Sequence, residues 1–451
     1  MNVLGVIGIL TAFFMVIFLS YKGLNLVYVI IAACFVVIVT NGMNFIETFE
    51  NVIMAGIGEQ AASLLAVYLF GALFGKVFID SGAAQSFTNG LMNILAKNAD
   101  DERRRTTALM VLIFTGALLC YVGIDTNASM VTMIGLGVGL FSATGIPRRF
   151  LPVSLVVSTT IGFTMPGSAN MIPVMISNMM GTTSLSGAVP GAIGALFVFI
   201  ASILLLKSKV RKAVAAGEIF EYGPLEPVKE TSDHQPHPIV AVLPLLAVIL
   251  LYNLANLPAW LAIACGLGIS MILFYTYMPI PEERLGGSSL VGKFWGLVET
   301  LNSGTMLAAV AAIFLFNFSL GLVINEAPAF QIIQNFFTSL NLPALVSLAI
   351  MCTVLVGASA GPGGVIISVL VATSVYIPEM GISAAACHRI IVAATAILDT
   401  LPFGGGCVMI MAMTNIKMKE GYPPIFQTTI LFTAIGLIIV TALLMLFPGL
   451  A

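Results

Sequence analysis

The chain has 451 residues, of which 59% are hydrophobic and only 8% charged, with a formal net charge of −2. Soluble proteins carry about 25% charged residues, so this composition excludes a water-soluble fold, and no basic stripe suggests nucleic acid. The apolar runs are long enough to cross a bilayer, which takes about 20 residues per helix, and no strand-like alternation recurs. We therefore expect an all-α polytopic membrane protein in contact with the lipid bilayer.

The cysteines are scattered along the chain and lie mostly within apolar segments. Buried thiols pack as small hydrophobic side chains, and the spacing fits neither a disulfide framework nor a metal site. We expect no metal and no cofactor. The residues are Cys34, Cys120, Cys265, Cys352, Cys387 and Cys407.

The apolar segments fall into two groups separated by one long polar stretch, residues 207–237, which is rich in Lys, Glu and Pro. The first group lies near 3–20, 24–41, 52–80, 106–122, 128–145, 150–181 and 188–206. The second lies near 238–255, 258–278, 294–325, 343–357, 364–378, 389–416 and 425–447.

The two groups have the same rhythm, which indicates an internal duplication. Gly123–Ser129 corresponds to Gly357–Gly364, and Thr164–Pro173 corresponds to Leu398–Cys407. These pairs share an offset of about 235 to 240 residues, as expected for a repeat. We therefore predict a first inverted repeat over 1–206, a cytoplasmic linker over 207–237 and a second inverted repeat over 238–451.

Within each repeat, two short apolar segments separated by Gly predict a re-entrant hairpin, and a long segment interrupted by Pro and Gly predicts a broken helix. The hairpins are 106–145 and 343–380, and the broken helices are 150–181 and 389–416. About ten further helices would span the membrane, an arrangement typical of secondary transporters with the site at the repeat interface.

Basic clusters predict the orientation, because cytoplasmic loops are enriched in Lys and Arg. With both termini outside the inner (cytoplasmic) membrane, the clusters fall inside. Only Arg389, beside His388, is left on the outer side, where the pair would attract anions or form a snorkelling flank. The clusters are Lys97–Arg105, Arg148–Arg149, Lys207–Lys212 and Lys417–Lys419.

The two predicted hairpin tips place polar groups between apolar arms. Asp125, Thr126 and Asn127 follow Gly123 at the first tip, and an ionisable group at membrane depth is a functional candidate by default. The alternative is that Asp125 caps the second arm at the cytoplasmic interface. At the second tip, Ser359 and three glycines would expose backbone N–H groups to an anion, or would form only a tight turn. The glycines are Gly361, Gly363 and Gly364.

The two predicted helix breaks carry the remaining candidates. In the first, Pro166 and Pro173 free backbone carbonyls, and Ser168 and Asn170 lie between them; a simple proline kink is the alternative. In the second, Asp399 and Thr400 precede Pro402 and three glycines, of which Gly404 and Gly405 would expose amides. Asp399 is the first candidate for a coupling carboxylate, with Asp125 as the second.

The sequence resembles the gluconate permease (GntP) family of the ion-transporter superfamily. The residues behind this resemblance are Thr164–Pro173, Asp399–Gly406, and the hairpin Gly123–Gly145 followed by Ile146–Arg149. The resemblance implies a proton-coupled symporter for gluconate or similar hydroxy carboxylates, re-entrant hairpins and a homodimer. It also implies that a hairpin and broken-helix bundle moves against a scaffold near 52–80 and 294–325.

The lack of basic residues in the predicted site limits the classes of substrate that it could bind. No Arg or Lys lies among its candidate residues, and a dicarboxylate or phosphate would usually require one. This favours a small monocarboxylate. Thr164–Asn170 lacks the histidine and proline-rich run of gluconate carriers, so short acids such as 3-hydroxybutyrate or lactate stay open beside gluconate.

Two other mechanisms remain beside proton symport. A sodium-coupled carboxylate transporter would belong to the same superfamily, and a passive anion channel would need a continuous pore. We do not expect an enzyme, because the sequence offers neither a metal-ligand pair nor a nucleophile with its base.

Overall fold

The computed structural model describes residues 2–223, 235–281, 289–359, 361–402 and 404–451. All regular elements in these ranges are helices, and six are long and apolar enough to cross a membrane. Shorter apolar helices accompany them, which confirms an all-α polytopic membrane protein. The six are Val3–Tyr21, Phe45–Asp80, Asp101–Tyr121, Ala188–Ala215, Ala259–Tyr277 and Met418–Leu446.

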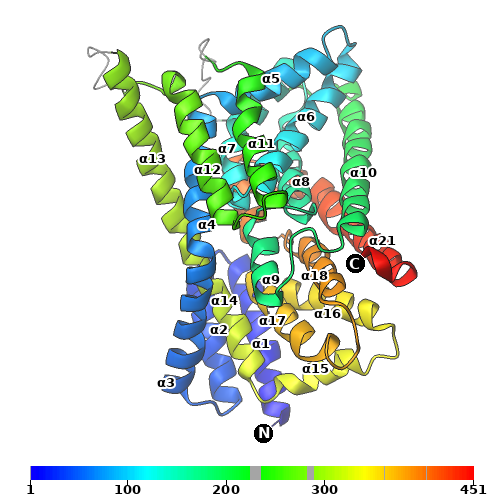
Figure 1. Ribbon diagram of the computed structural model, residues 1–451. Helices are drawn as coiled ribbons and strands as arrows, with labels where there is room; N and C mark the ends of the chain where they lie inside the picture. The colour runs from blue at the N-terminus through cyan, green and yellow to red at the C-terminus, as the bar shows by residue number, and fades with distance from the viewer. Residues whose placement is uncertain (1, 224–234, 282–288, 360, 403) are drawn as a thin grey trace.

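Two long helical columns pack side by side along one side of the molecule (Figure 1). The first column joins α3, η1 and α4, and the second joins α13, η5 and α14. Asp80 links the columns, because it pairs with Lys76 at 2.8 Å and accepts a hydrogen bond from Thr300 at 2.9 Å. The bounds are α3 (Phe45–Thr48), η1 (Phe49–Met54), α4 (Ala55–Asp80), α13 (Ser289–Ile313), η5 (Phe314–Asn317) and α14 (Phe318–Glu326).

Each column is flanked by a helical pair from the other half of the chain. The pair α1–α2 packs on α14, and the pair α11–α12 packs on α4, which places the two pairs towards opposite ends of the molecule (Figure 1). Asn25 caps the N-terminus of α2, and His237 caps that of α11. The bounds are α1 (Asn2–Tyr21), α2 (Leu26–Thr40), α11 (Pro238–Asn253), α12 (Ala259–Phe274) and η3 (Tyr275–Tyr277).

Helices α6, α7 and α10 of the first half pack around α8, whose residues from Leu151 to Phe163 are all buried. The chain turns between α6 and α7 and is interrupted between α8 and α9. Both interruptions fall inside the ranges predicted for the hairpin and the broken helix. The bounds are α5 (Ala83–Leu95), α6 (Asp101–Tyr121), α7 (Thr126–Thr144), η2 (Arg148–Phe150), α8 (Leu151–Thr164), α9 (Met171–Met180) and α10 (Ala188–Ala215).

The second half repeats this order. It turns between α16 and α17 and is interrupted between α18 and α19. The bounds are α15 (Phe330–Thr338), α16 (Ala344–Ala358), α17 (Pro362–Val371), η6 (Ala372–Tyr376), α18 (Ala384–Leu398), α19 (Gly405–Met413), α20 (Met418–Ile425), η7 (Phe426–Leu431), α21 (Phe432–Leu446) and η8 (Pro448–Leu450).

The predicted polar linker begins later than expected. Helix α10 continues through Lys207–Lys212 and ends at Ala215, because Val210 and Ala213 keep its inner face packed against the protein. The linker boundary at 207 was therefore wrong. Residues 224–234 of the linker lie outside the described part of the chain.

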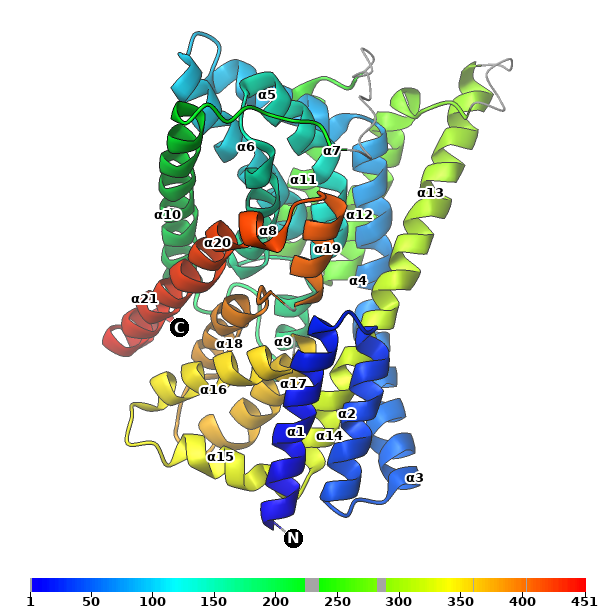
Figure 2. The same cartoon turned by 180° about the vertical axis from the view of Figure 1, so that it is seen from behind.

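Each of the two short helices that follow the breaks packs on helices of the other half of the chain. Helix α9 packs on α17 and α18, and helix α19 packs on α7 and α8. Figure 2 shows α8, α9, α17, α18 and α19 converging near mid-height of the molecule. The predicted tips and breaks therefore belong to one central region.

Candidate functional site

The first tip lies between α6 and α7 and packs on the middle of α4. The backbone of Gly123 approaches Gly71 so closely that a side chain on Gly71 would collide with it, and Ile124 lies over Gly75. Asp125 accepts a hydrogen bond from the backbone N–H of Ala128 at 3.1 Å. Asp125 therefore caps α7, which is the alternative role that the sequence analysis gave it. The tip that carries it packs on α4.

The first break is joined to this tip through side chains and backbone. Ala169 N–H donates to the carbonyl oxygen of Tyr121 at 2.8 Å, and the Ser168 hydroxyl donates to the same oxygen at 3.4 Å. Asn170 Nδ2 donates to the carbonyl of Ile124 at 3.4 Å, and its Oδ1 accepts from Ile172 N–H to cap α9. Ser168 and Asn170 are fully buried, so they connect the break to the tip.

A polar cluster completes this end of the site. Asn170 Nδ2 also lies 3.4 Å from the Sγ of Cys120, which is 3.9 Å from the hydroxyl of Thr126. Thr126 begins α7 and is partly exposed. Asn127 lies in the first turn of α7, and its side chain is outside the described part of the structure. Of the predicted residues, Thr126, Ser168 and Asn170 are thus brought together with Asp125.

The backbone polar groups of the first break are hydrogen-bonded to three other segments. Tyr121 Oη donates to the carbonyl of Pro166 at 3.0 Å, and Asn253 Nδ2 donates to that of Gly167 at 3.0 Å. Gly167 N–H donates to the carbonyl of Ser184 at 3.0 Å. The break is therefore a folded element with its own partners, more than a proline kink.

Arg389 closes this network from the second half of the chain. It is 1% exposed and donates to the carbonyl oxygens of Thr164 at 3.2 Å, Ser184 at 2.8 Å and Ser186 at 2.6 Å. Thr164 ends α8, and a cation at a helix C-terminus interacts favourably with the helix dipole. Arg389 therefore fixes both the end of α8 and the loop that precedes α10.

Two expectations about this segment were wrong. His388 and Arg389 are both buried, so they form neither an anion-attracting outer mouth nor a snorkelling flank; His388 Nδ1 lies 2.8 Å from the hydroxyl of Thr182. The predicted site was also expected to hold no Arg or Lys, yet Arg389 binds the first break. The Thr182–Ser186 loop explains both errors, because it folds over the start of α18 and supplies carbonyl acceptors.

The second break faces the second tip. Asp399 directly follows α18 as its C-cap residue, and its Oδ1 lies 3.4 Å from the position that a Cβ on Gly361 would occupy. Gly361 has a φ of 120°, which side-chain-bearing residues rarely adopt. Asp399 is partly exposed, and no hydrogen bond or ion pair of its carboxylate is found among the described residues.

The other predicted residues of this end have local roles. Thr400 shares a hydrogen bond of 2.6 Å with the hydroxyl of Thr429, and the Ser359 hydroxyl donates to the carbonyl of Val356 at 3.3 Å. Gly363 packs on the backbone of α14, and Gly364 on that of α16. Gly404 precedes α19 and Gly405 begins it, while residues 360 and 403 are outside the described part.

A pocket of about 220 Å³ lies away from the tips and breaks, between α6 and α10. A smaller void beside Arg389 is lined by Thr164, Gly191 and Thr433. Neither of these two cavities is lined by Asp399 or by the first tip.

The motifs and the helical order can now be compared with known proteins. A family model described as GntP family permease matches residues 1–264, more than half of the chain. The protein belongs to the GntP permease family. The resemblance seen in the sequence is thereby confirmed, and the chain is a multi-pass membrane transporter.

One relative covers nearly the whole GntP permease chain. The Bacillus subtilis (strain 168) protein named Uncharacterized transporter YxjC is 23% identical over 475 residues, which span 94% of this chain and 96% of that one. Two solved structures are similar in outline. The YdaH transporter of Alcanivorax borkumensis has a TM-score of 0.43 at 15% identity, covering 88% of this chain and 87% of its own. MtrF of Neisseria gonorrhoeae, from a class described as antimetabolite efflux pumps, has a TM-score of 0.47 at 12% identity, covering 89% and 84%.

The sequence analysis gave Arg389 the wrong role and missed Tyr121 and Asn253 in this permease's central region. Arg389 had a visible signal, because a charge within the apolar run of α18 must find partners. Tyr121 and Asn253 had a weaker one, since each ends an apolar helix. Their acceptors lie far away in sequence, so only the fold reveals the contacts.

Proposed function

We propose that this permease is a secondary active transporter that couples uptake of a small hydroxy monocarboxylate to a proton through Asp399. The observation that supports this most is the position of Asp399, a partly exposed carboxylate at a helix break, beside a glycine-lined hairpin tip. An ionised carboxylate at membrane depth is unfavourable without compensation, which favours a site that takes up a cation together with its substrate.

The substrate carboxylate would bind at a helix N-terminus near Asp399. Helix α19 begins with Gly405–Gly406, and glycine lets a ligand approach backbone N–H groups closely. A helix N-terminus favours an anion. Thr126 and Thr400 would add hydroxyls that suit a hydroxylated acid, and Asn127 would add an amide.

Arg389 does not change the preference for one carboxylate group. Its guanidinium donates to carbonyl oxygens of Thr164, Ser184 and Ser186, so it acts on the substrate through the first break. A second carboxylate or a phosphate would need an additional cation facing the ligand. Gluconate, 3-hydroxybutyrate and lactate remain within the proposed class.

The reciprocal packing of the two halves supports two inverted repeats and alternating access. Helices α9 and α19 exchange partners between the halves, and α1–α2 and α11–α12 do the same. We propose that the hairpins and broken helices move against the α4–α13 columns. The basic ends of α6 and α10 lie at the end of the molecule opposite the N-terminus (Figure 1), which supports an inner-membrane protein with its N-terminus outside.

Uptake into proteoliposomes tests the function. Purified protein is reconstituted, and labelled gluconate, 3-hydroxybutyrate and lactate are supplied under an imposed pH gradient, a sodium gradient, or neither. We expect accumulation above the external concentration of at least one acid under the pH gradient alone. Accumulation driven only by sodium would replace the proton with sodium, and equilibration without accumulation under any gradient would indicate a channel.

A further inference from the structure

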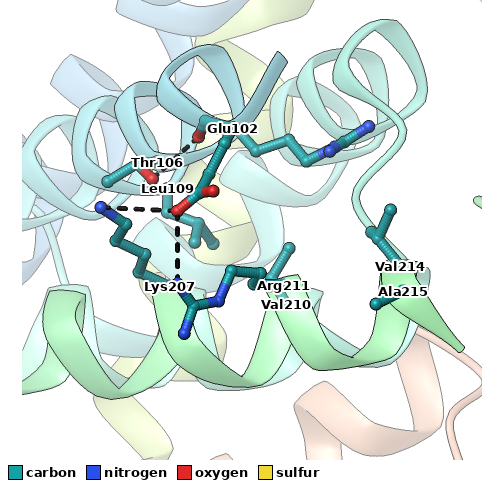
Figure 3. A pocket seen from close by; sticks show the side chains of 9 residues that line it. Glu102, Thr106, Leu109, Lys207, Val210, Arg211, Val214 and Ala215 are labelled. Carbon is teal, nitrogen blue, oxygen red and sulfur yellow. Dashed lines mark hydrogen bonds and ion pairs between the residues drawn. The ribbon is translucent and has the colours of Figure 1, made fainter. Parts of the chain in front are cut away.

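A second candidate site lies far from the central region, between the first turns of α6 and the last turns of α10. The pocket measures about 220 Å³ and is lined by charged groups at its rim and by apolar side chains such as Leu109, Val210 and Val214 at its floor. Figure 3 shows Glu102 of α6 facing Lys207 and Arg211 of α10. The pocket therefore combines a polar rim with an apolar wall.

The rim carries more positive than negative charge. Arg105, Lys207 and Arg211 line the pocket with Glu102 as the only carboxylate in its lining, which leaves two positive charges in excess. Glu102 is shared between Lys207 at 3.6 Å and Arg211 at 3.9 Å. Both pairs are long and partly exposed, and exposed pairs of this kind contribute little. A phosphate group could therefore take over Lys207 and Arg211 with little loss.

The outer surface of α10 leads directly to this rim. Its exposed apolar residues recur at spacings of three and four, and Lys207 and Arg211 continue the same spacing, so all lie on one helical stripe. In a membrane protein, such a stripe lies against lipid acyl chains. The exposed apolar residues are Val189, Ile193, Leu196, Ile200 and Leu204.

We propose that this pocket binds the headgroup of an anionic phospholipid. The phosphate would lie on Lys207 and Arg211, with Arg105 beside it, and the acyl chains would follow the apolar stripe of α10. Charge-assisted contacts of Arg and Lys with phosphate are strong and directional, and basic pockets between membrane helices suit anionic headgroups. The lipid would join α10 to α6, and so hold the outer helix of the bundle to its core.

Lipid retention and thermal stability of the purified full-length protein test the proposal. The protein in detergent is mixed with phosphatidylglycerol, phosphatidylcholine, or inorganic phosphate, and followed by native mass spectrometry and thermal unfolding. We expect saturable retention of phosphatidylglycerol with a rise in Tm, and neither effect from phosphatidylcholine. An equal effect of phosphatidylcholine, or an equal rise in Tm from inorganic phosphate, would overturn the assignment.

A matched pair of double variants locates the site. K207Q/R211Q removes two cations from the pocket, whereas K209Q/K212Q removes two from the same turns of α10 outside the pocket lining. Because each cation near an anionic headgroup contributes separately, K207Q/R211Q should retain phosphatidylglycerol about thirtyfold more weakly. Equal weakening in K209Q/K212Q would show a general surface effect and contradict the pocket.

A third variant keeps the test decisive if K207Q/R211Q does not fold. Glu102→Gln removes the carboxylate that competes for Lys207 and Arg211, so phosphatidylglycerol should be retained more strongly than by the unchanged protein. Retention that falls or stays the same in E102Q would contradict a phosphate held by these two cations.

Discussion

The two helix breaks differ in how they are held. The first, residues 165–170, is bound by the tip at Tyr121 and Ile124 and by Asn253, and Arg389 holds the carbonyl of Thr164 directly before it. For the second, residues 399–404, the described side-chain contact to another segment is the hydrogen bond between Thr400 and Thr429. Breaks at corresponding positions of the two halves have thus diverged. The first is a fixed element, and the second bears a carboxylate and has few restraints among its described residues.

The difference assigns separate roles to the two breaks. A break whose carbonyls are satisfied inside the protein is expensive to rearrange, because each buried polar group would lose its partner. A break with few partners can change conformation when a ligand binds. We therefore expect the first break to position the site and the second to couple it to the cation.

The largest effect should come from Asp399→Asn. The amide keeps the size of the side chain but cannot exchange a proton, so accumulation driven by a pH gradient should be lost. Exchange of labelled for unlabelled substrate, which needs no net proton movement, should persist. Asp125→Asn is the control, because Asn caps a helix as well as Asp does, and it should accumulate substrate; the reverse result would transfer the coupling role to the first tip.

The next largest effect should come from Arg389→Gln. It leaves the carbonyl oxygens of Thr164, Ser184 and Ser186 without their donor, a loss of about 3 kcal/mol in the free energy of unfolding. Because the first break shifts, the KM for uptake should rise more than kcat falls. Arg389→Lys keeps the charge without the planar fork and should be intermediate. A lower Tm with an unchanged KM would reduce Arg389 to a purely structural residue.

Gly361→Ala should have a smaller effect on uptake, because Gly361 lies beside Asp399 of the second break. A φ of 120° is unfavourable for alanine, at about 1–3 kcal/mol, and the new methyl would meet the Asp399 carboxylate. Gly381→Ala is the matched control, since Gly381 also has a positive φ but no neighbour within 4 Å. Both should lower Tm, and only G361A should reduce uptake; equal uptake in the two would separate the second tip from the site.

The smallest effect should come from Asn170→Ser. The hydroxyl still caps α9, but the shorter side chain no longer donates to the carbonyl of Ile124. A neutral hydrogen bond contributes about 1 kcal/mol, so Tm should fall slightly and uptake should be reduced moderately. Asn170→Ala loses the cap as well and should fall further; an alanine variant as stable as the unchanged protein would contradict the link between tip and break.

Much of this organisation could be predicted from sequence because glycine and proline mark helix ends locally. The interruptions at residues 122–125, 165–170 and 399–404 follow from Gly123, Pro166 and Pro402 in apolar runs. The composition and the long apolar runs likewise predicted an all-α membrane protein. These features depend on residues next to each other in the chain.

The contacts that distinguish the two breaks could not be predicted in the same way. Arg389 lies more than 200 residues from its acceptors at Thr164 and Ser184, so no local pattern pairs them. The end of α10 was misplaced for a related reason, since its polar sequence hides a buried inner face at Val210 and Ala213. Both the contacts of Arg389 and the end of α10 depend on packing between segments that are distant in sequence.

Proton movement during transport tests the central claim most directly. Proteoliposomes containing a pH-sensitive dye are given the transported acid without any imposed gradient, and internal acidification is recorded for the unchanged protein, D399N and D125N. We predict substrate-dependent acidification for the unchanged protein and D125N, and none for D399N although it still exchanges substrate. Acidification by D399N equal to that of the unchanged protein would contradict the account.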